Sequence, residues 1–122
     1  STLFPYTTLF RSPAGTDIVL FDKTHRVVVK VKAYFEKDSV TPEQESAYSD
    51  FCKNKIARLN TVETLLSNYA NGHAKKRFTP RTLLFNRDGS YAMLLDDQED
   101  EENGVAVTLA PESKIVAQDD YL

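Results

Sequence analysis

Apolar and polar residues alternate along much of the chain, and the period of the alternation predicts the elements. In residues 26–36 every second residue is apolar, which is typical of a half-buried strand. The apolar run at residues 17–22 precedes it, and residues 23–25 are polar. We therefore expect a hairpin that turns at residues 23–25. Further strands are predicted at 82–86, 91–95, 104–109 and 114–117, the first two joined by an Asp-Gly turn.

One long helical segment is predicted between these groups of strands, from Thr41 to Tyr69. Thr41 is placed to be the N-cap, Pro42 fits the first helical position, and Gln44 completes a capping box. Beyond them, apolar residues recur at spacings of three and four and form a single stripe. Asn60 is a candidate for a break in the helix and for the cap of a second one.

The order of elements is ββ-α-ββββ, which predicts an α+β fold. We expect an antiparallel sheet of about six strands with the helical segment packed on one face. Because 122 residues are one domain's worth of chain, residues 13–122 are expected to form a single domain. The residues expected in the core are Val27, Val29, Val31, Phe35, Phe51, Cys52, Ile56, Leu59, Leu84, Leu94, Val105 and Val107.

Composition limits the chemistry that the chain can perform. Apolar residues make up 41% and charged residues 27%, as in globular domains, and no apolar run is long enough to span a membrane. A single cysteine, Cys52, excludes an intramolecular disulfide and a cysteine-based zinc site. The two histidines, His25 and His73, have no spacing that indicates a metal site. We therefore expect no metal, no cofactor and no catalytic residues, and the chain is not predicted to be an enzyme.

The first residues have a different character. Residues 2–12, TLFPYTTLFRS, resemble the translation of a sequencing adapter, and we expect residues 1–12 to be a non-native extension with no functional role. A short strand is the structural alternative. As a non-native extension, the segment is still expected to be able to adhere to an exposed edge of the sheet through apolar side chains such as Phe4 and Phe10.

Charge is distributed unevenly between the two parts of the chain. Residues 1–81 hold 13 Lys/Arg and 8 Asp/Glu, whereas residues 82–122 hold 2 Lys/Arg and 10 Asp/Glu. Six acids fall within seven positions, residues 96–102, which we call the acidic segment. Three interpretations are open for this segment: a solvated connecting loop, a cation-binding loop, and a surface that binds a basic partner. The spacing does not match a calcium loop, because the required glycine and the last glutamate are missing.

A short basic cluster, Lys75, Lys76 and Arg77, follows the helical segment. It lacks the interleaved aromatic residues of a single-strand binder, and the net charge of the chain is −3. We expect a solvated loop here and no binding of nucleic acid.

The C-terminal part, Phe78–Leu122, resembles a group of small bacterial domains that are often immunity proteins beside polymorphic or contact-dependent toxins. The resemblance rests on Asp88-Gly89, on Glu102-Asn103-Gly104-Val105 after an acidic loop, and on Gln118-Asp119. The preceding helix, with Gln44, Ala47-Tyr48 and Phe51, is also similar. One departure is Ala92, where the group has glycine. The resemblance covers residues 17–122 and implies a cytoplasmic protein that neutralises a cognate toxin domain.

We therefore expect the chain to bind the C-terminal domain of a toxin, plausibly a basic nuclease, and to block its active surface. The expected partner-binding residues are Asp96, Asp97, Glu99, Asp100, Glu101 and Glu102, with Tyr91 and Tyr121 as aromatic anchors that could equally belong to the core. The alternative is a non-catalytic binding module or a mobile-element inhibitor with another partner. A toxin gene directly upstream would distinguish the two. The oligomeric state does not follow from the sequence.

Overall fold

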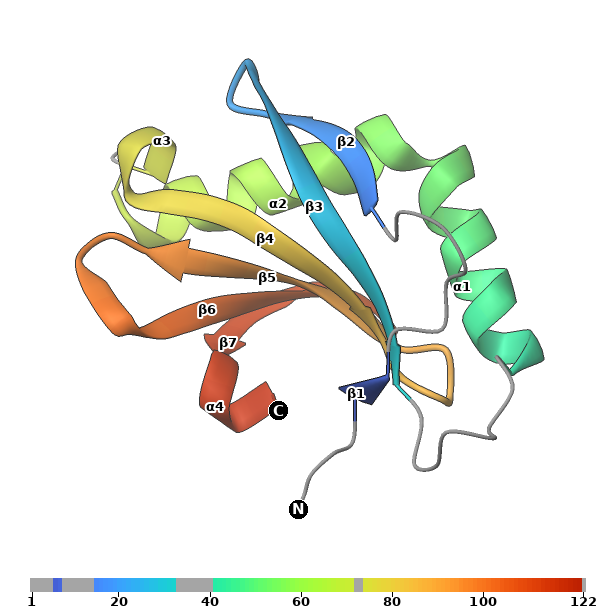
Figure 1. Cartoon of the computed structure of the whole chain (residues 1–122). Coiled ribbons are helices and arrows are strands. Elements are labelled where there is room, and N and C mark those ends of the chain that lie inside the picture. Colours follow the sequence, from blue (N-terminus) through green and yellow to red (C-terminus); the bar gives the residue numbers. More distant parts are fainter. Residues whose placement is uncertain (1–5, 8–14, 33–40, 72–73, 122) are drawn as a thin grey trace.

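Two layers make up the protein, a seven-stranded sheet and a pair of helices that cross one face of it (Figure 1). The computed structural model describes residues 6–7, 15–32, 41–71 and 74–121, without the side chains of residues 6, 7, 32, 74, 75 and 101. The strands are β1 (Tyr6–Thr7), β2 (Gly15–Leu20), β3 (Lys23–Lys32), β4 (Phe78–Phe85), β5 (Tyr91–Asp97), β6 (Asp100–Ala110) and β7 (Lys114–Ala117). The helices are α1 (Pro42–Lys53), α2 (Lys55–Tyr69), α3 (Ala74–Arg77) and α4 (Gln118–Tyr121). The predicted α+β fold is confirmed.

The strand order is β1-β3-β4-β5-β6-β7, and β2 also pairs with β3. The expectation of an antiparallel sheet holds for every pair except β3 and β4, which are parallel, with Val29 beside Leu83. The physical reason is the connection: α1 and α2 lie between β3 and β4 in the chain and cross the sheet, and a crossover of this kind joins parallel strands.

The β2–β3 hairpin turns earlier than the polar residues 23–25 predict. Phe21 and Asp22 form the turn, with φ of 51° and 63°. Two consecutive residues with positive φ match the twist of the flanking strands, which is why this turn is favoured in two-residue hairpins. The carboxylate of Glu63 on α2 accepts a hydrogen bond from the Phe21 backbone at 2.9 Å and so ties the turn to the helix layer.

The capping box at the start of α1 is confirmed. The Thr41 hydroxyl accepts a hydrogen bond from the Gln44 backbone at 3.1 Å, and the Gln44 side chain accepts one from the Thr41 backbone at 2.9 Å. The break between the helices, however, is at Asn54 and not at Asn60. The Asn54 amide donates to the backbone carbonyl of Asp50 at 3.1 Å, and such a side-chain bond competes with the helical ladder.

The core lies between the helices and the sheet, and eight of the twelve residues predicted for it are buried. Buried as expected are Val27, Val29, Val31, Phe51, Leu59, Leu84, Val105 and Val107. Phe35 is outside the described residues.

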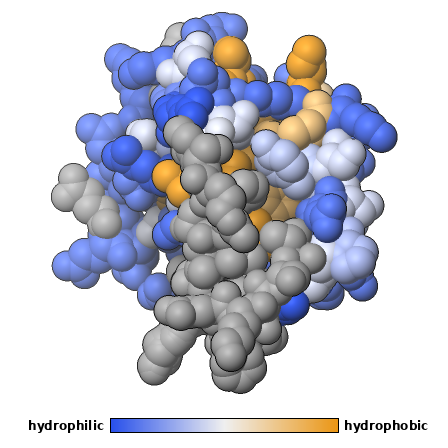
Figure 2. Space-filling view, turned by 45° about the vertical axis from the view of Figure 1, so that its right-hand side comes forward, coloured by the Kyte–Doolittle hydropathy of each residue, from blue (hydrophilic) through white to orange (hydrophobic). Residues whose placement is uncertain are grey.

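The expected burial is wrong at Cys52 and Ile56, which are exposed, Ile56 by 79%, and Leu94 is only half-buried. One stripe was extrapolated through both helices, but at about 100° per helical residue Cys52 and Ile56 point well away from the buried Phe51, and the buried side of α2 is Leu59, Val62 and Leu66. Leu94 faces the side of the sheet that α1 and α2 do not cover. On the face drawn in Figure 2, exposed apolar side chains form small separate areas among hydrophilic ones.

Two residues of the N-terminal extension pair with the sheet. Tyr6 and Thr7 form β1 beside Lys32 and Val31, at the end of β3. The prediction concerned the side chains of Phe4 and Phe10, which are outside the described residues, so their adhesion to a sheet edge stays a prediction.

Removing residues 1–12 is expected to lower the free energy of unfolding by less than about 1 kcal/mol, because each backbone hydrogen bond contributes about 1 kcal/mol net and ordering the segment opposes this. Chemical denaturation of chains 1–122 and 13–122 measures the difference. A loss above about 2 kcal/mol would make the extension an integral edge strand of the domain.

Candidate functional site

The acidic segment forms the end of the β5–β6 hairpin, not a long loop. Strand β5 continues to Asp97, Gln98 and Glu99 make a two-residue turn, and β6 begins at Asp100, which pairs with Asp97. The hairpin lies at the end of the sheet next to α3 (Figure 1). The six acids of the acidic segment are close together at this end of the hairpin and repel one another, so neighbouring cations stabilise it.

Arg77, at the end of α3, supplies most of this stabilisation. Its Nε and Nη2 atoms donate to the two oxygens of Asp97 at 2.8 and 2.9 Å, a bidentate pair. The Asp97 side chain is only 3% exposed, and these hydrogen bonds lower the pKa of its carboxyl below the ordinary value. The Arg77 carbonyl also accepts from the Gln98 backbone at 2.7 Å, and the Asp97 carboxylate accepts from the Glu99 backbone at 3.0 Å. Asp97 is therefore an internal support of the hairpin.

Two aromatic rings hold Arg77 in place. Its guanidinium carbon lies 5.4 Å from the centre of the Tyr69 ring and 5.1 Å from that of Phe78, distances at which cation–π attraction acts. The two rings are 6.0 Å apart. Phe78 is buried, whereas Tyr69 is half exposed and borders the hairpin. The expectation that Arg77 belongs to a solvated loop is wrong, because the side chain is largely covered and fully engaged.

The other acids differ in how they are paired. Asp96 bonds Arg81 at 2.7 Å, with both side chains exposed, and Glu99 lies 3.8 Å from Arg77. Asp100 and Glu102 are exposed, and in the part of the chain that the structure describes neither forms an ion pair. The side chain of Glu101 is outside the description. Glu99, Asp100 and Glu102 are thus exposed to solvent together with Asp96, which Arg81 pairs.

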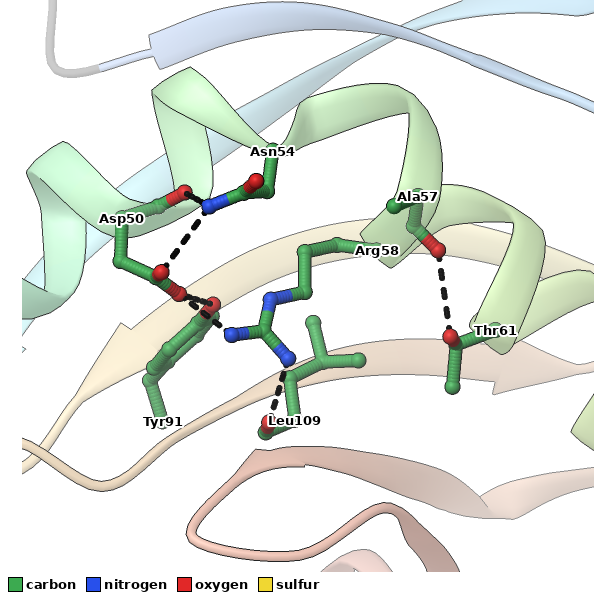
Figure 3. A network of polar contacts seen from close by, with 7 residues as sticks. All are labelled: Asp50, Asn54, Ala57, Arg58, Thr61, Tyr91 and Leu109. Atoms are coloured by element: carbon green, nitrogen blue, oxygen red, sulfur yellow. Dashed lines mark hydrogen bonds and ion pairs between the residues drawn. The ribbon is translucent and has the colours of Figure 1, made fainter.

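Tyr91, one of the two expected anchors, belongs to the core. It is 1% exposed, its ring stacks on Phe85 at 4.9 Å, and burial raises the pKa of its hydroxyl to about 12. The hydroxyl donates to Asp50 at 3.2 Å, and Asp50 accepts from Arg58 at 2.6 Å (Figure 3). Tyr91 is therefore buried in the folded protein and cannot contact a partner.

Tyr121, the second expected anchor, is half-buried on α4. Its hydroxyl oxygen accepts a hydrogen bond from the Asn86 amide at 2.8 Å. Asn86 directly follows β4, so this bond attaches α4 to the β4–β5 turn. The two tyrosines and the acidic segment do not form one surface.

The network around Asp50 borders a cavity of 630 Å³ between α1 and the β4–β5 turn. Its acids are Glu43, Asp50 and Asp88. Hydrogen bonds from Arg58 lower the pKa of Asp50, and Asp88 accepts from the backbone and hydroxyl of Ser90 at 2.9 and 2.7 Å. Two of the three carboxylates thus serve the fold. In the described parts of the chain, no group of three or more His, Cys, Asp or Glu side chains could hold a metal ion.

The residues that carry the resemblance to immunity domains have structural roles. Gly104 leaves room for the Gln118 amide, which donates to the carbonyls of Leu95 and Val105 at 2.8 and 3.3 Å. The β5–β6 register shifts after Leu95, so this bond occupies a carbonyl at an irregular point of the ladder. Gly89, with φ of 91°, packs against the backbone of α1.

Gln44 provides a second connection between the helix and the sheet. It is buried, and its amide donates to the Phe85 carbonyl at 3.3 Å in addition to its role in the capping box. The Thr41 hydroxyl donates to the Arg87 carbonyl at 2.9 Å. The motif residues therefore attach α1 to the end of the β4–β5 hairpin, which explains them without reference to a partner.

No protein-family model, curated protein or solved structure matches the chain. Among the residues that the structure describes, no helix is long and apolar enough to cross a membrane.

Sequence reasoning did not identify Arg77 and Arg81 as partners of the acidic segment. The one available signal was the excess of positive charge in residues 1–81 opposite the negative residues 82–122. That imbalance predicts attraction between the two parts of the chain, but it does not indicate which arginines meet which acids.

Proposed function

We propose that the chain is an immunity protein, which binds a basic toxin domain of a contact-dependent or related system and blocks its active surface without catalysis. The observation that carries the proposal is the β5–β6 hairpin end, where Glu99, Asp100 and Glu102 are exposed while Arg77 holds the turn beneath them. The backbone that carries these acids is thus held in place, and a partner does not have to order it on binding.

The chemistry of the partner follows from this charge. A nuclease active site is built to attract phosphate, and carboxylates arranged on a projecting hairpin present a similar negative field. Exposed ion pairs contribute below about 1 kcal/mol each, so binding also needs an apolar anchor. Since Tyr91 is buried, Tyr69 takes that role here: it is 51% exposed and its ring lies beside Arg77.

The proposal is tested with a chain in which the four acids Glu99, Asp100, Glu101 and Glu102 are replaced by Gln or Asn. Asp96 and Asp97 stay, because Asp97 supports the turn. We expect association with the toxin domain encoded by the upstream reading frame to slow about tenfold in low salt and to lose most of its salt dependence. Stopped-flow kinetics measures both effects, and thermal unfolding verifies the fold.

The matched control neutralises four exposed acids elsewhere on the chain and changes the net charge equally: Asp17→Asn, Asp22→Asn, Glu45→Gln and Glu112→Gln. It is expected to keep most of the association rate, because steering depends on charge near the contact. If the variant that lacks the four acids of the hairpin associates with the toxin domain at an unchanged rate, the acidic segment is only a solvated connection between β5 and β6. The absence of a toxin gene beside this one would favour a different partner.

A further inference from the structure

Helices α1 and α2 cross one face of the sheet (Figure 1), and the other face carries a small groove. The residues of β4 and β5 that lie in the core include Leu83, Phe85, Met93 and Leu95. Successive side chains of a strand point to opposite faces, so Thr82, Leu84 and Leu94 point away from the core. The groove, of 280 Å³, is lined by these three residues and by Lys30 on β3 and Gln118 on α4, among others. Pockets for drug-sized ligands measure about 300–1,000 Å³, so this one fits a smaller molecule.

Lys30 brings a positive charge to the groove without a counter-charge. Its side chain is half-buried, and within the described residues no acid forms an ion pair with it. Asp96 also lines the groove, but it bonds Arg81 at 2.7 Å. In the register of the sheet Lys30 lies beside Leu84, whereas Asp96 lies beside Thr79, near the other end of β4. A lysine that is partly withdrawn from water without a partner favours an anion beside it.

Arg81 adds a second cation to the same groove. Its Nε atom bonds Asp96, and its two outer nitrogens form no hydrogen bond with the residues that the structure describes. Among the described residues that line the groove there are thus two cations and one acid, which gives it a net positive charge. A carboxylate suits two such donors, because each of its oxygens accepts a hydrogen bond. The remaining part of the ligand has to be apolar, since it lies against Leu84 and Leu94.

Two neutral polar groups of the groove are also available to a ligand. The Thr82 hydroxyl and the carbonyl oxygen of the Gln118 side chain have no hydrogen-bond partner in the described part of the chain. The Gln118 nitrogen, in contrast, donates to the carbonyls of Leu95 and Val105 at 2.8 and 3.3 Å, which fixes the side chain. Its oxygen is therefore a positioned acceptor for an N–H group of the ligand.

We propose that this groove binds an apolar carboxylate of about the size of one amino-acid residue, such as the C-terminal residue of a peptide. Lys30 and Arg81 hold the carboxylate. The apolar side chain of the ligand packs on Leu84 and Leu94, and its amide N–H donates to the Gln118 oxygen. The site does not depend on the proposed toxin binding, because none of these residues is among the four acids replaced in the hairpin variant.

Titration of the isotope-labelled chain with N-acetyl-leucine, followed by NMR, tests the proposal. We expect saturable shifts of the backbone amides around the groove with a Kd of about 1 mM, since a small ligand with one charge binds weakly. N-acetyl-leucinamide has the same side chain but no charge, and it should bind at least about tenfold more weakly.

Isocaproate keeps the side chain and the carboxylate of N-acetyl-leucine but lacks the amide N–H. Weaker binding of isocaproate supports the C-terminal residue of a peptide as the ligand. Equal binding supports a simple apolar carboxylate, which belongs to the same chemical class.

Lys30→Gln removes the charge and should weaken the binding of N-acetyl-leucine about tenfold, whereas Lys30→Arg keeps the charge and should change it less than about threefold. Lys53→Gln is the matched control, because it removes the same charge from an exposed position on α1, in the other layer of the protein, and should have no effect. Thermal unfolding of each variant verifies the fold.

Three results would overturn the proposal: no saturable shift around the groove up to about 20 mM N-acetyl-leucine, equal affinity for N-acetyl-leucinamide, or a Lys30→Gln variant that binds as tightly as the wild type. None of them bears on toxin binding, which the association kinetics of the four-acid variant test separately.

Discussion

Replacing Arg77 by alanine is expected to lower the free energy of unfolding by about 3 kcal/mol. The change leaves the carboxylate of Asp97 buried without its bidentate partner, at a position only 3% exposed. Removing one partner of a buried ion pair costs about 3–5 kcal/mol, and the lower end applies because Arg77 is itself partly accessible. Urea unfolding measures the loss. Arg77→Lys keeps the charge but not the two parallel hydrogen bonds, so an intermediate loss is expected.

The effect has a defined dependence on pH. The pKa of Asp97 is lower in the folded chain than its ordinary value of 3.8. Its contribution to stability is therefore fully present above that value and is lost as the pH falls through the folded pKa. The difference in the free energy of unfolding between the wild type and Arg77→Ala should accordingly become smaller at acidic pH.

Arg81→Ala is the matched control, because its ion pair with Asp96 is exposed on both sides. A change below about 1 kcal/mol is expected there. Equal losses for Arg77 and Arg81 would mean that general charge neutralisation, and not the buried pair, holds the hairpin.

Replacing Gly104 by alanine is expected to cost about 2–3 kcal/mol, although the position is only half-buried. A Cβ atom there would overlap the Gln118 amide and the Leu95 carbonyl oxygen. The side chain of Gln118 can move away, but it then gives up two hydrogen bonds, and the Leu95 backbone cannot move without disturbing β5. Thermal and chemical unfolding of the variant measure the cost.

A double-mutant cycle separates the two contacts. Gln118→Ala alone should cost about 1 kcal/mol for the lost hydrogen bonds. In the Gln118→Ala variant, Gly104→Ala should lower the free energy of unfolding by less than it does in the wild type. The loss that remains there is due to the overlap with the Leu95 carbonyl oxygen. Additive losses would show that Gly104 and Gln118 do not interact, against the geometry described above.

The two predictions concern the two ends of one hairpin region. Arg77 organises the acidic turn, and the Gly104–Gln118 contact organises the ladder behind it. Both act through neighbours and neither is proposed to touch a partner. A loss of toxin binding in these variants would therefore follow the loss of folded hairpin, whereas the four-acid variant should lose association rate with the fold intact.

The fold class and a part of the core could be predicted from the sequence alone. Alternation of period two at residues 26–32 and the capping box at Thr41 and Gln44 are local signals, because strand alternation and helix capping depend on residues close in the chain. The Asp88-Gly89 turn is also a local signal, because the turn itself requires the positive φ of Gly89.

The tertiary structure alone decided which distant residues meet. Whether Tyr91 was core or surface depended on packing of α1 over β4 and β5, and the pairing of Arg77 with Asp97 joins residues 20 positions apart. Ile56, which one continuous stripe had placed inside, is exposed, because α2 packs on the sheet through Leu59, Val62 and Leu66. The charge imbalance predicts that the basic and the acidic parts of the chain attract each other. Coulomb attraction does not, however, specify which residues form pairs. Only the crossover of the helices, which brings α3 beside the β5–β6 hairpin, selects Arg77 for Asp97.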